Sequence, residues 1–269
     1  MSAQNRVGGL SVASHAISHD DLIRDQFSRQ AALFARSPEL HDDAQLTPLI
    51  DAARPQPHEA MIDLACGPGT VVAAFASRVQ RAVGVDATEA MLDEARRIAR
   101  EKRLENVEWR AASVYALPFP DASFNIVTCR FAFHHLQEPA RAFAEMARVC
   151  RGGGRIVLCD GVAPADTKKA AAFNTMERFR DPSTVNFLPL SVLLGLFAQA
   201  NLSTPAIRPF HVTYTIEELV AKSFPMDDDR VTLRHMIEEL VATDALEVGT
   251  KPGGAHFIFP VAVLAATKP

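Results

Sequence analysis

Residues 61–70, Met-Ile-Asp-Leu-Ala-Cys-Gly-Pro-Gly-Thr, predict a strand that runs directly into a tight turn and a helix. The apolar side chains that open this stretch suit a parallel strand covered on both faces. Gly67 and Gly69 let the following backbone turn sharply and approach a ligand closely. The helix predicted over residues 70–77 would present free N–H groups to an anion or a ribose lying over the turn.

The glycine spacing separates this turn from the dinucleotide-binding fingerprint, Gly-x-Gly-x-x-Gly, because Val72 stands where the third glycine would be needed. Instead an acid, Asp63, is followed four and six residues later by Gly67 and Gly69. This pattern resembles the class I S-adenosylmethionine-dependent methyltransferases, in which the strand-end acid and the glycine turn hold the methionine part of the cofactor. A strand, turn and helix of an unrelated α/β domain is the alternative for this motif alone.

A chain of 269 residues accommodates one α/β domain with insertions more simply than two small domains. Its net charge of -4 argues against nucleic acid or an anionic membrane surface as a standing partner. No apolar run approaches the ~20 residues of a membrane helix, and the N-terminus lacks a signal-peptide core. We therefore expect a cytoplasmic protein, with its oligomeric state open.

Strands and helices are predicted to alternate strictly between residues 59 and 161, which indicates parallel strands joined by right-handed crossovers. With the resemblance, this predicts a doubly wound, mostly parallel seven-stranded α/β sheet with helices on both faces, an antiparallel last strand and helical cap insertions. We predict a single methyltransferase domain over residues 1–269: a mobile arm over 1–19, N-terminal helices over 20–58, the cofactor-binding core over 59–161, and core completion with cap insertions over 162–269.

A second acid, Asp86, follows the strand predicted over residues 81–85, about twenty residues past the glycine turn, where an acceptor for two ribose hydroxyls is wanted. A carboxylate suits this task because it only accepts hydrogen bonds, and charge-assisted bonds are the stronger ones. The plainer interpretation is a solvent-facing aspartate in a turn.

Leu117-Pro118-Phe119, before the predicted fourth strand, is typical of the small-molecule branch of the resembled family. Relatives often carry an Asp four residues before this Leu, where it contacts the adenine amino group. Here that position is Ser113, which with the backbone of Val114 would contact adenine more weakly. The resemblance implies these cofactor-binding residues: Phe27, Asp63, Ala65, Gly67, Gly69, Asp86, Ala87, Met91, Ser113, Val114, Arg130 and His135.

Two adjacent histidines, His134 and His135, follow the predicted fourth strand, and loops at this edge of such a sheet line the ligand crevice. Because imidazole titrates near neutrality, we predict His134 as a general base and His135 as a brace or cofactor contact. A packing role is an equal alternative for each, and His41 or Tyr214 is the other candidate base. Adjacent histidines seldom converge on one metal ion, so no metal site is expected.

Other local signals concern the ends of elements and the cysteines. Asp20 or Asp21 is expected to cap the first helix and Ser191 a later one, and Gly152 to Gly154 to form a turn before the fifth strand. The four cysteines lie far apart and are expected to be buried free thiols.

The predicted reaction is S-adenosylmethionine-dependent methyl transfer to a C, O or N atom of a small molecule, a secondary metabolite or an aromatic, quinone-like acceptor. Cyclisation or isomerisation without methyl transfer is the alternative. His134-His135 stands where we expect Arg-Asn-Val in quinone-ring methyltransferases, so that reaction is not assigned. We expect two or three of the aromatic residues in the cap segments to contact the substrate. These residues are Phe173, Phe179, Phe187, Phe210, Tyr214, Phe224 and Phe257.

Overall fold

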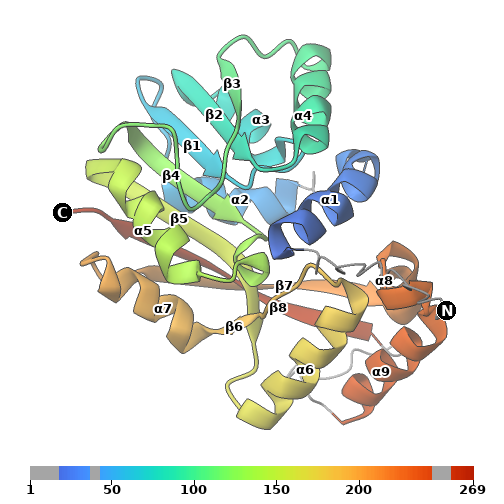
Figure 1. Ribbon diagram of the computed structural model, residues 1–269. Coiled ribbons are helices and arrows are strands. Elements are labelled where there is room, and N and C mark those ends of the chain that lie inside the picture. Colours follow the sequence, from blue (N-terminus) through green and yellow to red (C-terminus); the bar gives the residue numbers. More distant parts are fainter. Residues whose placement is uncertain (1–17, 37–42, 244–255) are drawn as a thin grey trace, which may run out of the picture.

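The computed structural model describes residues 18–36, 43–243 and 256–269 (Figure 1). Its helices are α1 His19–Arg36, α2 Asp43–Ala53, α3 Thr70–Ala76, α4 Glu89–Glu101, α5 Pro139–Val149, α6 Thr167–Arg180, α7 Leu190–Gln199, α8 Ile216–Lys222 and α9 Arg230–Ala242, with short 3-10 turns η2 Phe133–His135 and η3 Met226–Asp228. Its strands are β1 Ala60–Leu64, β2 Arg81–Asp86, β3 Val107–Ala111, β4 Phe124–Arg130, β5 Cys150–Ala163, β6 Leu188–Pro189, β7 Ala206–Thr215 and β8 His256–Thr267. The expected mobile arm lies outside the described residues, apart from Ser18 and His19.

One sheet runs through the molecule in the order β3-β2-β1-β4-β5-β8-β7, with the two-residue β6 beside β5. The pairs formed among β1 to β5 are all parallel, whereas β8 pairs antiparallel with both β5 and β7. This confirms the predicted α/β sheet with an antiparallel last strand. The strand order reverses at β1, which lies between β2 and β4, and doubly wound sheets bind ligands at the carboxyl ends of the strands at such a point.

Helices cover both faces of the sheet (Figure 1). Successive side chains along a strand point to opposite faces, so a strand that is apolar throughout gives both faces an apolar surface for helices to bury. On β1, Met61 packs in the apolar cluster shared with α2 and α3, while Ile62 and Leu64 pack in the cluster shared with α5 and α7. All three side chains are essentially inaccessible to water. Burying each contributes about 1.5–3 kcal/mol, and the strand is apolar on both faces for that reason.

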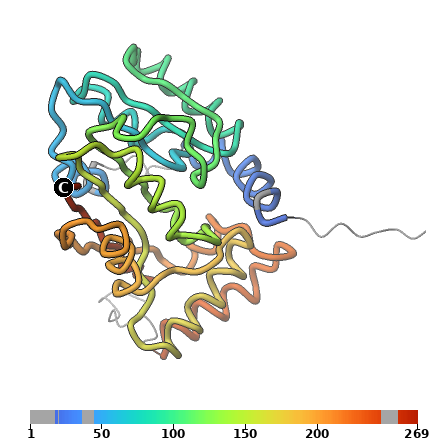
Figure 2. Tube along the Cα trace, turned by 60° about the vertical axis from the view of Figure 1, so that its left-hand side comes forward, coloured from blue at the N-terminus to red at the C-terminus, as the bar shows by residue number. Residues whose placement is uncertain are grey.

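The cap consists of α6, α8 and α9, which pack together beside the ends of β7 and β8 (Figures 1 and 2). Its own apolar cluster includes Phe173 from α6, Leu219 from α8 and Leu233 from α9, together with Phe257 and Phe259 of β8. A capping box of Thr215 and Glu218 begins α8. The cap therefore has an apolar cluster of its own, in addition to the clusters on the two faces of the sheet, and β8 contributes to that cluster.

Two predicted helix caps are wrong. The Oγ of Ser18 accepts the backbone N–H of Asp21 at 3.2 Å, so Ser18 caps α1 in place of Asp20 or Asp21. Pro189 occupies the N-cap position of α7, which starts at Leu190 without a side-chain cap, so Ser191 already lies inside the helix.

The glycines at 152–154 do not separate a helix from a strand as expected. They lie inside β5, which already pairs with β4 at Cys150 and resumes pairing at Arg155, opposite Phe124 and Ile126. Gly153 takes up a left-handed conformation with φ 73°, and glycine allows the local irregularity at little steric cost. The three glycines therefore form a bulge that lets one long strand span the molecule.

Candidate active site

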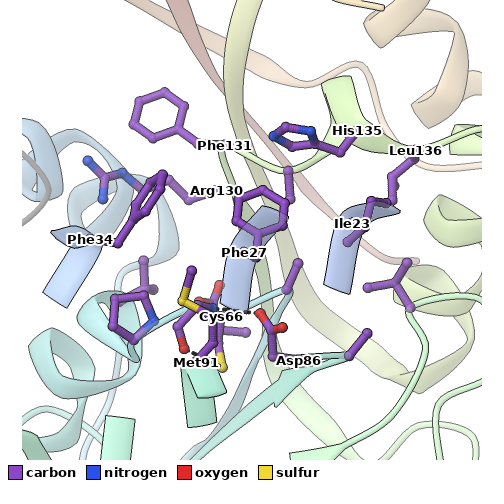
Figure 3. Close-up of a pocket in the computed structure, with 18 of the residues that line it drawn as sticks. Ile23, Phe27, Phe34, Cys66, Asp86, Met91, Arg130, Phe131, His135 and Leu136 are labelled. Carbon is purple, nitrogen blue, oxygen red and sulfur yellow. Dashed lines mark hydrogen bonds between the residues drawn. The ribbon is translucent and has the colours of Figure 1, made fainter. Parts of the chain in front are cut away.

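A first cavity of about 170 Å³ lies at the carboxyl ends of β1, β2 and β4, beneath α1 (Figure 3). The cavity therefore lies at the topological switch point of the sheet, where the strand order reverses at β1. The described residues that line it are Ile23, Arg24, Phe27, Phe34, Asp63, Ala65, Cys66, Gly67, Pro68, Thr70, Val71, Asp86, Ala87, Met91, Ser113, Val114, Tyr115, Arg130, Phe131, Ala132, His135 and Leu136.

Asp63, near the end of β1, brings a buried carboxyl group to this wall. It accepts a 2.6 Å hydrogen bond from Oγ1 of Thr128 on β4, and burial raises its pKa to about 7. The next wall residue, Ala65, has a left-handed φ of 50°, as does Phe131 after β4 with φ 54°. Such conformations are uncommon for residues other than glycine and cluster at ligand sites. Both turns are therefore held by the surrounding structure.

Asp86 ties the glycine turn to the end of β2. Its Oδ2 accepts the N–H of Gly67 and its Oδ1 accepts the N–H of Thr88, both at 2.8 Å. Burial raises the pKa of this carboxyl group, although the backbone donors counteract the shift. Each carboxylate oxygen has a second acceptor site, so Asp86 can still receive hydroxyl groups from the cavity.

Arg130, the last residue of β4, supplies a cation to the same wall. Its Nη2 donates to Oε1 of Gln45 at 3.2 Å, and its guanidinium lies 4.6 Å from the ring centroid of Phe131. Burial lowers the pKa of Arg130, while the nearby Cys159 and Asp63 oppose that shift. The cavity therefore combines a buried cation with buried carboxyl groups.

The structure brings most of the expected cofactor residues together in this wall. They are Phe27, Asp63, Ala65, Gly67, Asp86, Ala87, Met91, Ser113, Val114, Arg130 and His135. Gly69 lies outside it. A Cβ at Gly69 would come within 2.4 Å of the Trp109 ring, so this glycine is required by packing and by its φ of 79°. Sequence reasoning missed other wall residues, such as Tyr115 and Phe131, whose only signal is adjacency to the residues that it chose.

A second cavity, of about 310 Å³, adjoins the first and shares Phe27, Phe34, Phe131 and His135 with it. The described residues that line the second cavity alone are Gln30, Leu33, Arg36, Gln45, His134, Gly161, Arg180, Asp181, Phe187, Val212, Tyr214, Leu219, Lys222, Phe224, Phe259 and Val261. Of the cap aromatics, it includes Phe187, Tyr214 and Phe224, whereas Phe173 and Phe257 are fully buried in the cap cluster. The two cavities meet beneath α1.

His134 lines only the second cavity, and Asp160 at the carboxyl side of the sheet orients it. Its Nδ1 lies 2.7 Å from Oδ1 of Asp160, and its backbone N–H donates to Oδ2 at 3.1 Å. The imidazole stacks on Phe187 with ring centroids 4.2 Å apart. This geometry assigns the proton to Nδ1 and leaves Nε2 as the acceptor. Sequence reasoning missed Asp160, although it is an acid in the strand next to the one that precedes His134.

His135 lines both cavities and makes different contacts. Its Nδ1 lies 3.1 Å from Oγ of Ser183, which itself donates to Oδ1 of Asp181 at 2.6 Å. Its carbonyl oxygen lies 2.9 Å from Nε2 of His19, and Phe27 packs edge-on against its ring at 4.9 Å. Burial, together with the neighbouring histidine, lowers the pKa of His135 to about 3. The ring is therefore neutral near pH 7 and joins α1, the β4 loop and the cap.

All four cysteines are buried free thiols, as predicted. Within residues 18–36, 43–243 and 256–269, no group of three or more His, Cys, Asp or Glu side chains is arranged to hold a metal ion. No helix in this part of the chain is long and apolar enough to cross a membrane. His41, a candidate for the base, lies outside the described residues.

The chain is similar to known methyltransferases both in sequence and in structure. A family model described as "Methyltransferase domain" matches residues 62–158. The uncharacterized methyltransferase YcgJ of Bacillus subtilis is 32% identical over 211 residues, which cover 78% of this chain and 83% of YcgJ. The crystal structure of YcgJ superposes with a TM-score of 0.75 and 30% identity over 84% of this chain and 99% of YcgJ.

Two further likenesses are narrower. The demethylmenaquinone methyltransferase of Clavibacter sepedonicus is 40% identical over 114 residues, which cover 42% of this chain and 45% of that protein. The [4+2]-cyclase SpnF shares the fold, with a TM-score of 0.61 over 84% of this chain and 80% of SpnF, at 17% identity. The similarity to YcgJ extends over most of both proteins, and on this ground the chain belongs to the class I S-adenosylmethionine-dependent methyltransferases of the small-molecule type.

Proposed function

We propose that the first cavity binds S-adenosylmethionine, that the second binds the methyl acceptor, and that the methyl group crosses the wall that they share. The observation that carries this proposal is the meeting of the two cavities at Phe27, Phe34, Phe131 and His135. A methyl donor in one cavity and an acceptor in the other would face each other there. Transfer needs such alignment, which can supply up to ~7–11 kcal/mol of the barrier in favourable systems.

The residues of the first cavity fit this cofactor. A Cβ built at Gly67 would have no neighbour nearer than Sδ of Met91 at 4.0 Å, so the turn leaves room for a ligand against the backbone. In this proposal Asp86 accepts the ribose hydroxyls, and Ser113 and Val114 contact adenine; all three line the cavity. Asp63 and Arg130 offer opposite charges to the ammonium and carboxylate of the methionine part. When bound, S-adenosylmethionine supplies a methyl group on a cationic sulfur, and this sulfur departs readily as a neutral thioether when the methyl group is transferred.

His134 is the proposed general base on the acceptor side. Asp160 holds the proton of His134 on Nδ1, so Nε2 is free to accept a proton from an O–H or N–H acceptor as the new bond forms. His135 acts differently, because its lowered pKa makes it a poor base and its position on both walls makes it a contact for cofactor and acceptor. An acceptor without such a proton would need only the alignment.

A secondary metabolite or an aromatic, quinone-like molecule is the acceptor that we propose. The aromatic rings of the second cavity support this choice, as does the likeness of the core to demethylmenaquinone methyltransferases. The rival function, cyclisation or isomerisation, has only the shared fold of SpnF in its favour.

Transfer of label from S-adenosylmethionine tests the proposal. The full chain is incubated with methyl-labelled S-adenosylmethionine and a small-molecule extract of its source cell. A newly labelled small molecule supports methyl transfer. An unlabelled rearranged product would support the rival function, and the absence of any new product would contradict both.

A further inference from the structure

The wall of the second cavity combines aromatic side chains with positive charge. Among the described residues that line it, Arg36, Arg180 and Lys222 are cationic and Asp181 is the one carboxylate. That carboxylate is already used, because its Oδ1 accepts both the N–H and the Oγ–H of Ser183. Burial raises the pKa of Asp181, but its interactions with His135 and Arg180 and the hydrogen bonds from Ser183 outweigh burial and lower it. The acid therefore stays ionised and turned toward Ser183.

Arg180 is held in a fixed orientation. Its Nε donates to Oε2 of Glu177 at 2.8 Å, its Nη2 lies 2.7 Å from the same oxygen, and its guanidinium sits 5.9 Å from the ring centroid of Phe259. The Arg180 side chain is 19% exposed, and Glu177 is completely buried. Nη1 makes no hydrogen bond or ion pair with any residue of the described chain. It is the part of the guanidinium that remains for a ligand in the cavity.

Lys222 lies close to the same aromatic group. Its Nζ is 5.1 Å from the ring centroid of Tyr214, and Tyr214 packs edge-on against Phe259 at 6.1 Å. One aromatic pair therefore carries two cations, one from α6 and one from α8. Neither cation lines the first cavity, so both lie at an end of the second cavity whose wall the first cavity does not share.

We propose that the methyl acceptor has an apolar body and an anionic group, a carboxylate or a phosphate, which Arg180 and Lys222 bind at this end of the second cavity. The atom that receives the methyl group then lies at the other end, beside His134 and His135, and the product keeps its negative charge. Charge-assisted hydrogen bonds to a guanidinium are strong in such a partly desolvated site. The inference rests on the proposed function of the second cavity as the acceptor site.

Two fluorescent probes that differ in one charged group test the anion site. 1-Anilinonaphthalene-8-sulfonate carries a sulfonate, and N-phenyl-1-naphthylamine is its neutral counterpart. We expect Arg180→Gln in the full chain to weaken binding of the sulfonate probe about 10-fold, the loss of one charge-assisted contact, while binding of the neutral probe stays unchanged. Arg178→Gln, on the exposed side of the same helix, is the matched control and should alter neither.

A second variant keeps the test valid if loss of the partner of buried Glu177 impairs folding. Lys222→Gln leaves the Arg180–Glu177 pair intact and should also weaken the sulfonate probe selectively. Unchanged sulfonate binding in folded Arg180→Gln and Lys222→Gln proteins overturns the proposal. Equal losses for both probes would overturn it as well, since they would indicate a change in cavity shape.

The charge of the labelled product of the transfer reaction is an independent test of the anion site. We expect it to be retained by an anion exchanger at pH 7, and its accurate mass distinguishes a carboxylate from a phosphate. A neutral labelled product overturns the anion site and leaves the methyltransferase function standing. Selective binding of the sulfonate probe without any label transfer has the opposite meaning, because the anion site then stands and the proposed function fails.

Discussion

The two adjoining cavities are built in different ways. The first is built around backbone turns at the ends of adjacent parallel strands, where Ala65 and Phe131 adopt left-handed conformations and Gly67 donates to Asp86. The second is formed by side chains that α1, the β4 loop, the cap helices and the two antiparallel strands contribute. A site made of backbone is fixed by the topology of the sheet, whereas a site made of side chains can change one substitution at a time. We therefore expect the first cavity to determine the class of reaction and the second to determine its acceptor.

The largest expected effect separates chemistry in the second cavity from binding in the first. His134→Ala should lower the rate of methyl transfer about 10²- to 10⁴-fold, the usual contribution of a positioned base, while affinity for S-adenosylmethionine barely changes. Single-turnover kinetics and calorimetry measure the two quantities. His211→Ala, on an exposed part of β7, is the control. A near-normal rate for His134→Ala would assign the base to another residue, or leave alignment alone responsible.

The next largest expected effect is on the affinity of the first cavity for S-adenosylmethionine. Asp86→Ala should weaken the binding of S-adenosylmethionine about 10- to 100-fold, since a charged acceptor of two hydroxyls contributes about 1.5–3 kcal/mol. Asp93→Ala, on the exposed face of α4, should leave affinity unchanged. NAD should not compete. Calorimetry that gives equal affinities for Asp86→Ala and the unaltered chain would remove Asp86 from the site.

A third prediction concerns stability without ligand. The pKa of Asp63 is raised from 3.8 to about 7, so the unfolded chain ionises this group first and folded stability falls as the pH rises between these values. Asp63→Asn should therefore stabilise the ligand-free protein by about 1–3 kcal/mol at pH 8 and hardly at all at pH 4. Denaturant unfolding at both pH values measures this difference. An equal gain at both would show that burial of the charge is not its cause.

Removal of metal ions is expected to have no effect on the rate of methyl transfer. Treatment with EDTA should leave methyl transfer unchanged, because the methyl group is already activated by its cationic sulfur and needs no Lewis acid. The rate is compared before and after chelation, with and without added Mg²⁺. Loss of activity that Mg²⁺ restores would contradict this prediction and indicate a metal-assisted acceptor.

Sequence patterns predicted the first cavity better than the second for a physical reason. Asp63 and Asp86 lie at the carboxyl ends of the apolar strands β1 and β2, and Gly67 comes soon after β1. Parallel strands bring their carboxyl ends to one edge of the sheet whatever the rest of the chain does. Asp160 reaches His134 from the adjacent strand β5, and the identity of neighbouring strands depends on the whole sheet. Ser183 contacts His135 and donates to Asp181, and the separation of 48 residues between Ser183 and His135 hides this contact from local sequence patterns.

The organisation of the cap also depends on long-range packing. Phe173 and Phe187 are close in sequence and both belong to the cap cluster, yet only Phe187 also lines the second cavity and stacks on His134. Aromatic residue type alone cannot separate these two roles, because both positions exclude water on at least one face of the ring. The prediction of a single domain over the whole chain remains a prediction.

Helix α1 contributes Phe27 and Phe34 to the walls of both cavities, and His19 at its start contacts the carbonyl oxygen of His135. One helix therefore forms part of the wall of both proposed ligand sites. We expect the two products to leave past this helix, so that their departure times are correlated. If opening of α1 is slower than chemistry, a substitution that loosens its contact with His135 should raise the steady-state turnover while leaving the first turnover unchanged.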